Sequence, residues 1–226
     1  MKWLYLLLDT ATIFFPFILS FDKKVAYFKK WKYVFFAGLI VGIPFLVWDY
    51  LFTKSGVWGF NPDYLFGIYL ANLPLEEVLF FVIVPFSCLF IYACVKVYFA
   101  AINFRKINKI FYVLIAGYIG FIAIFGYSGA YSQLVIASSI ITLIAIWFLR
   151  GRLHFLPVAF LISLIPFLLV NGVLTGGFTA EPIVWYNDLE RVPFRIFTIP
   201  AEDILYSFTL LGLNVVVFEK LQKITS

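Results

Sequence analysis

Residues 74–80 of this chain read PLEEVLF, and residues 200–206 read PAEDILY. Each stretch combines a proline, two adjacent acidic residues and the start of an apolar run. A second pair of matching stretches lies upstream, because IPFL at residues 43–46 recurs at residues 165–168. The two prolines of a copy are 30 residues apart from Pro44 to Pro74 and 34 apart from Pro166 to Pro200. The chain therefore contains an internal repeat.

The composition indicates that this repeat lies in a membrane. Hydrophobic residues make up 64% of the 226 residues and charged residues only 13%, whereas an ordinary globular chain is about 45–50% apolar and about 25% charged. This contrast excludes a soluble single domain, a disordered chain and a nucleic-acid-binding protein. A membrane-spanning helix needs about 20 apolar residues. Seven segments qualify, at residues 3–21, 33–52, 74–99, 110–127, 132–149, 155–174 and 200–218.

The basic residues predict how the chain is oriented. Thirteen of the 17 lysine and arginine residues lie at positions 23–32, 96–109 and 150–152 and in the C-terminal tail. Because such residues concentrate in cytoplasmic loops, we expect a multi-pass protein of the cell membrane with its N-terminus outside and its C-terminus in the cytoplasm. Cys88 and Cys94 share one apolar segment, where we expect neither a disulfide nor a metal site.

The repeat and the spans together predict an all-α integral membrane fold with seven transmembrane helices. The second and third spans match the sixth and seventh, the first and fifth complete the two units, and the fourth connects them. We expect a single membrane domain with a three-helix repeat at residues 1–109, a linking helix at 110–131 and a second three-helix repeat at 132–226. An even number of spans separates the copies, so the repeats are parallel, and parallel repeats frame a site between them.

Six acidic residues fall at or near membrane depth, namely Asp9, Asp49, Glu76, Glu77, Glu202 and Asp203. A charge at the bilayer centre costs at least about 2.5–3.5 kcal/mol, so acids within a membrane usually mark a functional site. Acids in the first turn of a helix also stabilise the helix dipole, by about 0.3–1 kcal/mol. That effect would explain one pair of acids, but not two pairs in matching sequence contexts.

Two such pairs can perform proton transfer. A carboxyl group in a dry site prefers to be neutral, whereas a helix N-terminus favours the anion. One protonated acid beside one carboxylate would supply a general acid and a general base in one cavity. Neighbouring residues on a helix point about 100° apart. We therefore expect Glu76 and Glu202 to face the cavity and each other, and Glu77 and Asp203 to hold or reload protons.

The paired acidic stretches resemble the motifs of the integral-membrane lycopene cyclases. The heterodimeric bacterial members have two small three-span subunits, and archaeal and fungal relatives fuse both halves into one chain, as here. The resemblance covers essentially the whole chain, with one departure at Ser207, where the first copy has Phe81. It implies proton-initiated cyclisation of the linear ends of lycopene to β-ionone rings, giving γ-carotene and β-carotene. Such a reaction is an isomerisation by an intramolecular lyase, and its substrate is a carotenoid dissolved in membrane lipid.

The resemblance implies catalytic roles for the four acids of the repeated stretches. The candidate substrate-binding residues are the aromatic side chains within two turns of them: Phe80, Phe81, Tyr206 and Phe208. Aromatic faces stabilise cations by about 0.5–2 kcal/mol each, although any one ring could simply pack against lipid in a chain with 29 Phe. The sequence has no G-x-G tripeptide, so it lacks the dinucleotide-binding fingerprint. We expect no cofactor and no metal.

Three other classes of membrane protein fit the sequence less well. A retinal photoreceptor needs a lysine in its last span, and residues 200–218 contain none; a prenyltransferase needs an Asp-rich site, and the chain has no Asp-Asp pair. A proton-coupled small transporter with parallel repeats is the strongest alternative, although apolar third and seventh spans favour a lipid-soluble substrate. The sequence leaves open the carotenoid length, cyclisation of one end or both, a β, γ or ε ring, and the oligomeric state.

Overall fold

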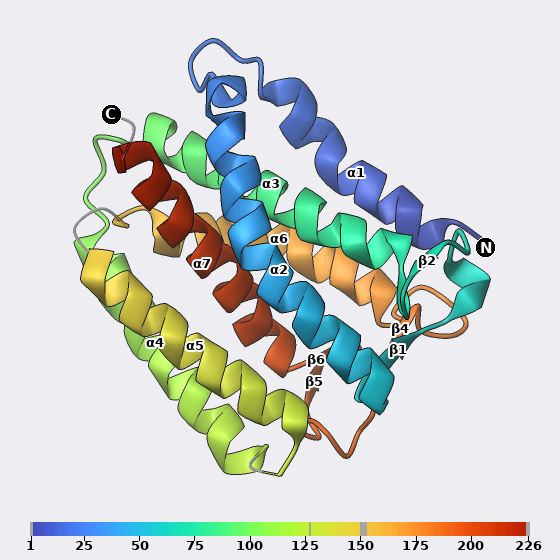
Figure 1. Cartoon of the computed structure of the whole chain (residues 1–226). Coiled ribbons are helices and arrows are strands. Elements are labelled where there is room, and N and C mark those ends of the chain that lie inside the picture. Colours follow the sequence, from blue (N-terminus) through green and yellow to red (C-terminus); the bar gives the residue numbers. More distant parts are fainter. Residues whose placement is uncertain (1, 127, 150–152, 225–226) are drawn as a thin grey trace.

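The computed structural model describes residues 2–126, 128–149 and 153–224, and these residues form a bundle of helices (Figure 1). Seven α-helices lie in the described residues: α1 (Leu4–Leu19), α2 (Trp31–Ser55), α3 (Leu75–Tyr98), α4 (Arg105–Phe125), α5 (Ala130–Leu149), α6 (Leu156–Leu174) and α7 (Glu202–Ile224). Six of them are long and apolar enough to cross a membrane, whereas α1 has 16 residues. The predicted all-α integral membrane fold with seven helices is confirmed.

The two halves of the bundle pack in the same way. Helix α1 packs along α3 as α5 packs along α7, and α2 contacts α7 as α6 contacts α3. Helix α4 lies against α5 and α6. Pro44 inside α2 and Pro166 inside α6 stand at matching positions of the repeat. A proline within a helix removes one backbone hydrogen bond, so both repeats interrupt the same helix at the same place.

Short strands close the end of the bundle that carries the acidic stretches. One strand pair joins the two halves of the chain: β1 (Trp58–Phe60) pairs with β4 (Val184–Tyr186). This pairing places Trp58 opposite Tyr186. Two hairpins pair β2 (Tyr69–Leu70) with β3 (Leu73–Pro74) and β5 (Arg195–Ile196) with β6 (Ile199–Pro200). Two short 3-10 turns, η1 (Tyr27–Lys30) and η2 (Pro62–Tyr64), complete the described elements.

The two hairpins are copies of one structure. Each has a two-residue turn whose first residue has a positive φ, 57° at Ala71 and 60° at Phe197. The second turn residue then bonds to the end of the preceding helix: Asn72 donates to the carbonyl oxygen of Tyr50, and Thr198 donates to that of Gly172. Each hairpin leads directly into the acidic stretch. The same backbone path therefore delivers both acidic pairs to the first turns of α3 and α7.

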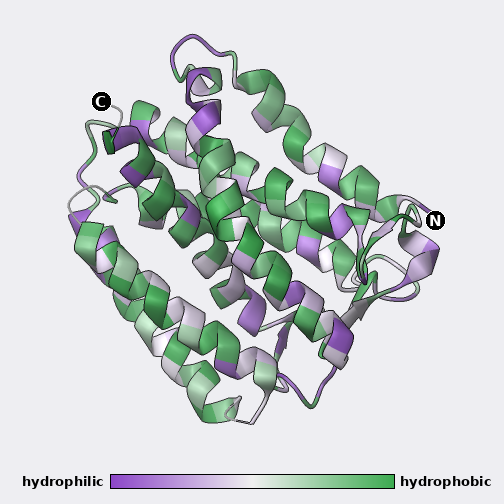
Figure 2. Ribbon diagram, viewed as in Figure 1, coloured by the Kyte–Doolittle hydropathy of each residue, from purple (hydrophilic) through white to green (hydrophobic). Residues whose placement is uncertain are grey.

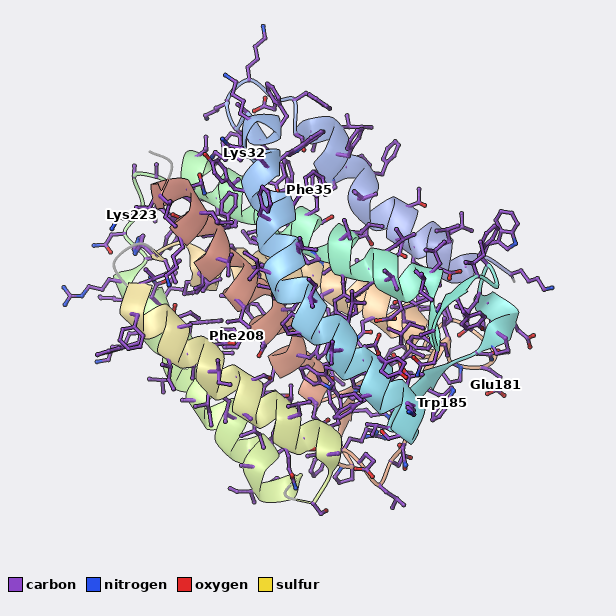
Figure 3. All side chains as sticks on the ribbon, viewed as in Figure 1. Lys32, Phe35, Glu181, Trp185, Phe208 and Lys223 are labelled. Atoms are coloured by element: carbon purple, nitrogen blue, oxygen red, sulfur yellow. The ribbon has the colours of Figure 1, made fainter. Side chains whose placement is uncertain are left out.

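Polar residues gather at two opposite ends of the bundle, while apolar residues cover most of the helices between them (Figure 2). Lys32 and Lys223 lie at one end, and Glu181 and Trp185 lie at the other (Figure 3). Large apolar side chains such as Leu114, 66% exposed, cover the sides of the helices. A surface of this kind suits contact with lipid, because helices satisfy most of their backbone polar groups internally.

We propose that the end with the basic loops is cytoplasmic and that the acidic stretches lie toward the outer face. Asn103, before α4, and Ser128, before α5, are exposed at opposite ends. Cysteines placed at these positions should react differently with an impermeant thiol reagent: intact cells label position 128, and lysed cells label both. The unmodified chain, with Cys88 and Cys94, is the control. Labelling of position 103 alone in intact cells would invert the orientation. Two basic residues behind this proposal, Arg150 and Arg152, lie outside the described residues.

Candidate active site

The first acid of each pair binds the backbone of the preceding loop. Glu76 Oε1 accepts a hydrogen bond from the N–H of Phe66 at 2.6 Å, and Glu202 Oε1 accepts one from the N–H of Val192 at 2.6 Å. Ser132 on α5 also donates to Glu202 Oε1, at 2.6 Å. Both glutamates are 0% exposed. They therefore fasten the loops before the hairpins to the starts of α3 and α7.

The second acid of each pair points to the centre of the bundle instead. Glu77 and Asp203 line one small cavity of about 60 Å³, and neither Glu76 nor Glu202 is among the residues that line it. The prediction that Glu76 and Glu202 face the cavity and each other is wrong. The loop N–H groups hold the first acids outward, and the turn of about 100° between neighbouring helical residues directs the second acids inward.

A tyrosine from another helix holds each of these inward acids. The Tyr5 hydroxyl on α1 donates to Glu77 Oε2 at 2.6 Å, and the Tyr131 hydroxyl on α5 donates to Asp203 Oδ1 at 2.5 Å. The separation along the chain is 72 residues in both cases. All four side chains lie in the walls of the small cavity. The repeat thus builds the same tyrosine–acid pair twice, once from α1 and α3 and once from α5 and α7.

The remaining partners of the two acids differ. Asp49 on α2 and Glu77 line the same small cavity, and their carboxyl groups lie close enough to interact. At the matching position after IPFL, α6 carries Asn171, whose Nδ2 donates to Asp203 Oδ2 at 2.7 Å. Asp49 and Asn171 also line the small cavity. A carboxyl group therefore accompanies the acid in the first half, and an amide accompanies it in the second.

The strands β1 and β4 join the two acid sites. Trp58 Nε1 donates to Asp49 Oδ1 at 2.5 Å, and the Tyr186 hydroxyl donates to Asp203 Oδ2 at 3.2 Å. These two donors are opposite each other in the strand pair. Burial, together with the Asp203 carboxylate, raises the pKa of Tyr186 well above its ordinary value. The Tyr186 hydroxyl consequently keeps its proton and acts as a donor at neutral pH.

A larger apolar cavity of about 440 Å³ adjoins the small one. Five residues line both: Phe80, Phe167, Asn171, Leu174 and Tyr206. Its walls come from α1, α3, α6 and α7. Phe15 of α1 and Leu169 of α6 line it and are 66% and 65% exposed, so it reaches the outer surface between these helices. The volume lies within the roughly 300–1,000 Å³ of small-molecule sites.

Only two of the four predicted substrate-binding aromatics line a cavity. Phe80 and Tyr206 stand where the two cavities meet. Phe81 packs against Phe45, and Phe208 packs against Phe111 and Phe160. Both are buried within the core, on sides of α3 and α7 that face neighbouring helices.

One comparison with known proteins matches the sequence of this chain. A family model described as lycopene cyclase matches residues 2–95 and 130–221. The chain belongs to the lycopene cyclase family. The family inferred from the acidic stretches is thereby confirmed, and with it a role in carotenoid cyclisation and a lipophilic carotenoid substrate. Neither the curated proteins nor the solved structures gave a match.

The predicted site residues did not include several residues of this candidate site, namely Tyr5, Asp49, Trp58, Tyr131, Asn171 and Tyr186. Of these, only Asp49 had been noticed in the sequence, as an acid at membrane depth. The repeat could have revealed two pairs of these residues, Tyr5 with Tyr131 and Asp49 with Asn171. Tyr5 and Tyr131 are separated by the same 126 positions as Glu77 and Asp203, and position 49 corresponds to position 171 once IPFL is aligned. Trp58 and Tyr186 had no such signal, because the strand pairing that joins them is a tertiary contact.

In the described residues, no group of His, Cys, Asp and Glu side chains could hold a metal ion.

The loop-fastening role of Glu76 and Glu202 can be measured as stability. Glu202→Ala leaves the buried N–H of Val192 without its acceptor, which should cost about 1–3 kcal/mol. Glu76→Ala does the same to the part-buried N–H of Phe66 and should cost less within that range. Glu76→Gln and Glu202→Gln keep an acceptor oxygen and should cost less. Thermal unfolding of the detergent-solubilised protein measures the difference, with Glu181→Ala in an exposed loop as the control. Unfolding of both alanine variants at the same temperature as the unmodified chain would contradict this role.

Proposed function

We propose that this chain is a lycopene β-cyclase that converts lycopene to γ-carotene and β-carotene by an isomerisation. One observation carries the proposal. An apolar cavity reaches the lipid-facing surface between α1 and α6 and adjoins the two inward acids, Glu77 and Asp203. A linear hydrocarbon dissolved in lipid could enter such a cavity end first. Its terminal double bond would then lie beside the carboxyl groups.

The chemistry needs one proton donor and one proton acceptor. The acid protonates the terminal double bond, and a tertiary cation results. The next double bond attacks this cation and closes a six-membered ring. The base then removes a proton from the ring cation. One proton is gained and one is lost, so the product is an isomer of the substrate and no redox cofactor is consumed.

We assign the two proton transfers to the inward acids. Glu77 and Asp203 are the catalytic residues of this proposal, because they share the cavity wall with Phe80 and Tyr206. The rings of Phe80 and Tyr206 stabilise the cation, at about 0.5–2 kcal/mol each. Glu76 and Glu202 each hold the loop that precedes their own hairpin. Phe81 and Phe208 act only through packing.

We further propose the following arrangement of the chain. It forms one membrane domain with repeats at residues 1–109 and 132–226 and a linking helix at 110–131. The position of α4 between the two ranges that match the family supports this division. The N-terminus lies outside and the C-terminus in the cytoplasm of the cell that carries the protein.

Expression in a lycopene-producing bacterium tests the activity. Extracted pigment should contain γ-carotene and β-carotene. Glu77→Gln and Asp203→Asn should each lower conversion by about 10²–10⁴-fold per amount of membrane protein, because general acids and bases contribute rate factors of this size. Glu76→Gln, which keeps the loop hydrogen bond, is the matched control and should retain most conversion. Recovery of lycopene alone from a folded, membrane-inserted protein would refute the cyclase proposal, and full activity of Glu77→Gln would refute the assigned site.

The repeat itself suggests a change that should close the cavity. Ser207 lines the large cavity, whereas Phe81, at the matching position, fills the core of the other half. Ser207→Phe should therefore occupy the space intended for the carotenoid end and reduce conversion severely without changing the acids. Ala137→Phe, on the exposed side of α5, is the control for an added ring. Pigment yield per folded protein is the measurement, and unchanged conversion by Ser207→Phe would show that the substrate enters elsewhere.

A further inference from the structure

The two acid sites differ at a position that the repeat makes directly comparable. Asp49 and Asn171 each follow an IPFL stretch by three residues. Asn171 donates a hydrogen bond to Asp203, and Asp49 lines the small cavity beside Glu77, close enough for the two carboxyl groups to interact. The side chains of Asp49 and Asn171 have nearly the same size and shape, yet one is a carboxyl group and the other an amide. The difference therefore changes which protons the site can hold, with little change in packing.

In the first half, the contact between carboxyl groups implies a proton. Two carboxyl groups can form a hydrogen bond with each other only when one of them is protonated, because two carboxylates offer no donor. Asp49 Oδ1 already accepts the Trp58 Nε1–H at 2.5 Å. This donor stabilises a carboxylate at Asp49. Tyr5 donates to Glu77 Oε2, so the other carboxyl oxygen of Glu77 remains to carry a proton toward Asp49. The nearby Asp9 carboxyl acts on Glu77 and favours its neutral form, so we place the shared proton on Glu77. Glu77 is thus arranged as a proton donor.

In the second half, the donors stabilise an anion instead. Asp203 accepts hydrogen bonds from Tyr131 at 2.5 Å, Asn171 at 2.7 Å and Tyr186 at 3.2 Å. Hydrogen bonds donated to a carboxylate favour its charged form. The Asn171 amide cannot share a proton with Asp203 in the way that a carboxyl group could. Asp203 is thus arranged as a proton acceptor.

Positions 9 and 135, which also correspond in the repeat, differ in the same way: the first half has a carboxyl group and the second half has none. Asp9 on α1 is 3% exposed and lies close enough to Glu77 and Glu76 for their charges to interact. The matching position on α5 is Val135, which is fully buried. The first half therefore gathers more carboxyl groups than the second. Since neighbouring carboxylates repel, the crowded half is the one that retains a proton.

We propose that Asp49 and Asn171 decide the direction of proton transfer, so that Glu77 is the general acid and Asp203 is the general base. This assignment rests on the proposed cyclase function. Asp49 and Asn171 are positioning residues that act through these two acids.

The proton balance of this assignment is complete. The Glu77 O–H proton moves to the inner, CH carbon of the terminal double bond and leaves a tertiary cation on the carbon that bears the two methyl groups. The next double bond forms a new C–C bond to that carbon and closes the ring, and Asp203 receives the proton lost from the ring. Asp203 is then protonated, and the Asp49–Glu77 pair has no proton. The proton returns across the small cavity that both acids line. Its volume of about 60 Å³ has room for bridging water once the product has left, since about 10–15 Å³ suffices for one water molecule.

Two nearly isosteric substitutions test the assignment by giving different products. Asp49→Asn removes the shared proton, so lycopene should remain and conversion should fall by about 10²–10⁴-fold. Asn171→Asp puts a second carboxyl group beside Asp203 and weakens the base. Protonation then continues, but the ring cation should lose a different proton or add water, and the share of ring isomers or hydroxylated rings should rise. A merely structural defect would lower the yield without changing the kind of ring.

The experiment uses the lycopene-producing bacterium, with pigments normalised to protein in the membrane. Asp63→Asn and Asn103→Asp make the same chemical changes at exposed positions and are the controls. Asp49→Glu restores a carboxyl group and should recover part of the conversion, which separates loss of the acid from misfolding of Asp49→Asn. Wild-type conversion by Asp49→Asn, lycopene alone from Asn171→Asp, or altered rings from Asp49→Asn would each overturn the assignment. Failure of the unmodified chain to form rings would overturn the proposed function instead.

Discussion

The hydrogen bond from a loop N–H to the first acid of each pair determines the rest of the site. When Phe66 binds Glu76 and Val192 binds Glu202, the rotation of α3 and α7 about their axes is set. The next residue then points about 100° away, into the bundle. An unpaired buried carboxylate would be costly, so the inward acids need partners, and the tyrosines of α1 and α5 provide them. Two loop contacts thus orient the acids of α3 and α7, and the inward acids in turn bind α1 and α5.

A two-fold repeat gives the chain a site at its centre, but a symmetric site would have no direction. Three matching positions break the symmetry. Ser207 opens one side of the bundle where Phe81 fills the other. Asn171 replaces the carboxyl group of Asp49, and Val135 replaces that of Asp9. The scaffold places two repeat-related acids in one cavity wall. In the proposed mechanism these few differences provide an entrance for the substrate and give the two acids different roles.

The sequence was sufficient for the fold class and for the region of the site, but not for its inner geometry. Long apolar runs locate six of the helices well, and the repeated acidic stretches identify the starts of α3 and α7. The angle between Glu76 and Glu77 follows from helix geometry, but which of them faces inward depends on the loop N–H groups and the hairpins. Those are contacts between segments, which periodicity along one helix cannot reveal. Comparing the repeats position by position would have added Tyr5 and Tyr131, whose spacing equals that of the inward acids.

The proposed isomerisation would place an unusual demand on a buried site, because it needs protons without consuming any. A site that exchanged protons freely with water would expose the carbocation to water as well. The cavity walls are largely aromatic and aliphatic, and the polar groups that reach it are side chains held by hydrogen bonds from the same small set of residues. The strand pair β1–β4 connects both acids through Trp58 and Tyr186. In the proposed mechanism a short internal return path between the two acids would meet this demand, and it would need both halves of the repeat in one assembled bundle.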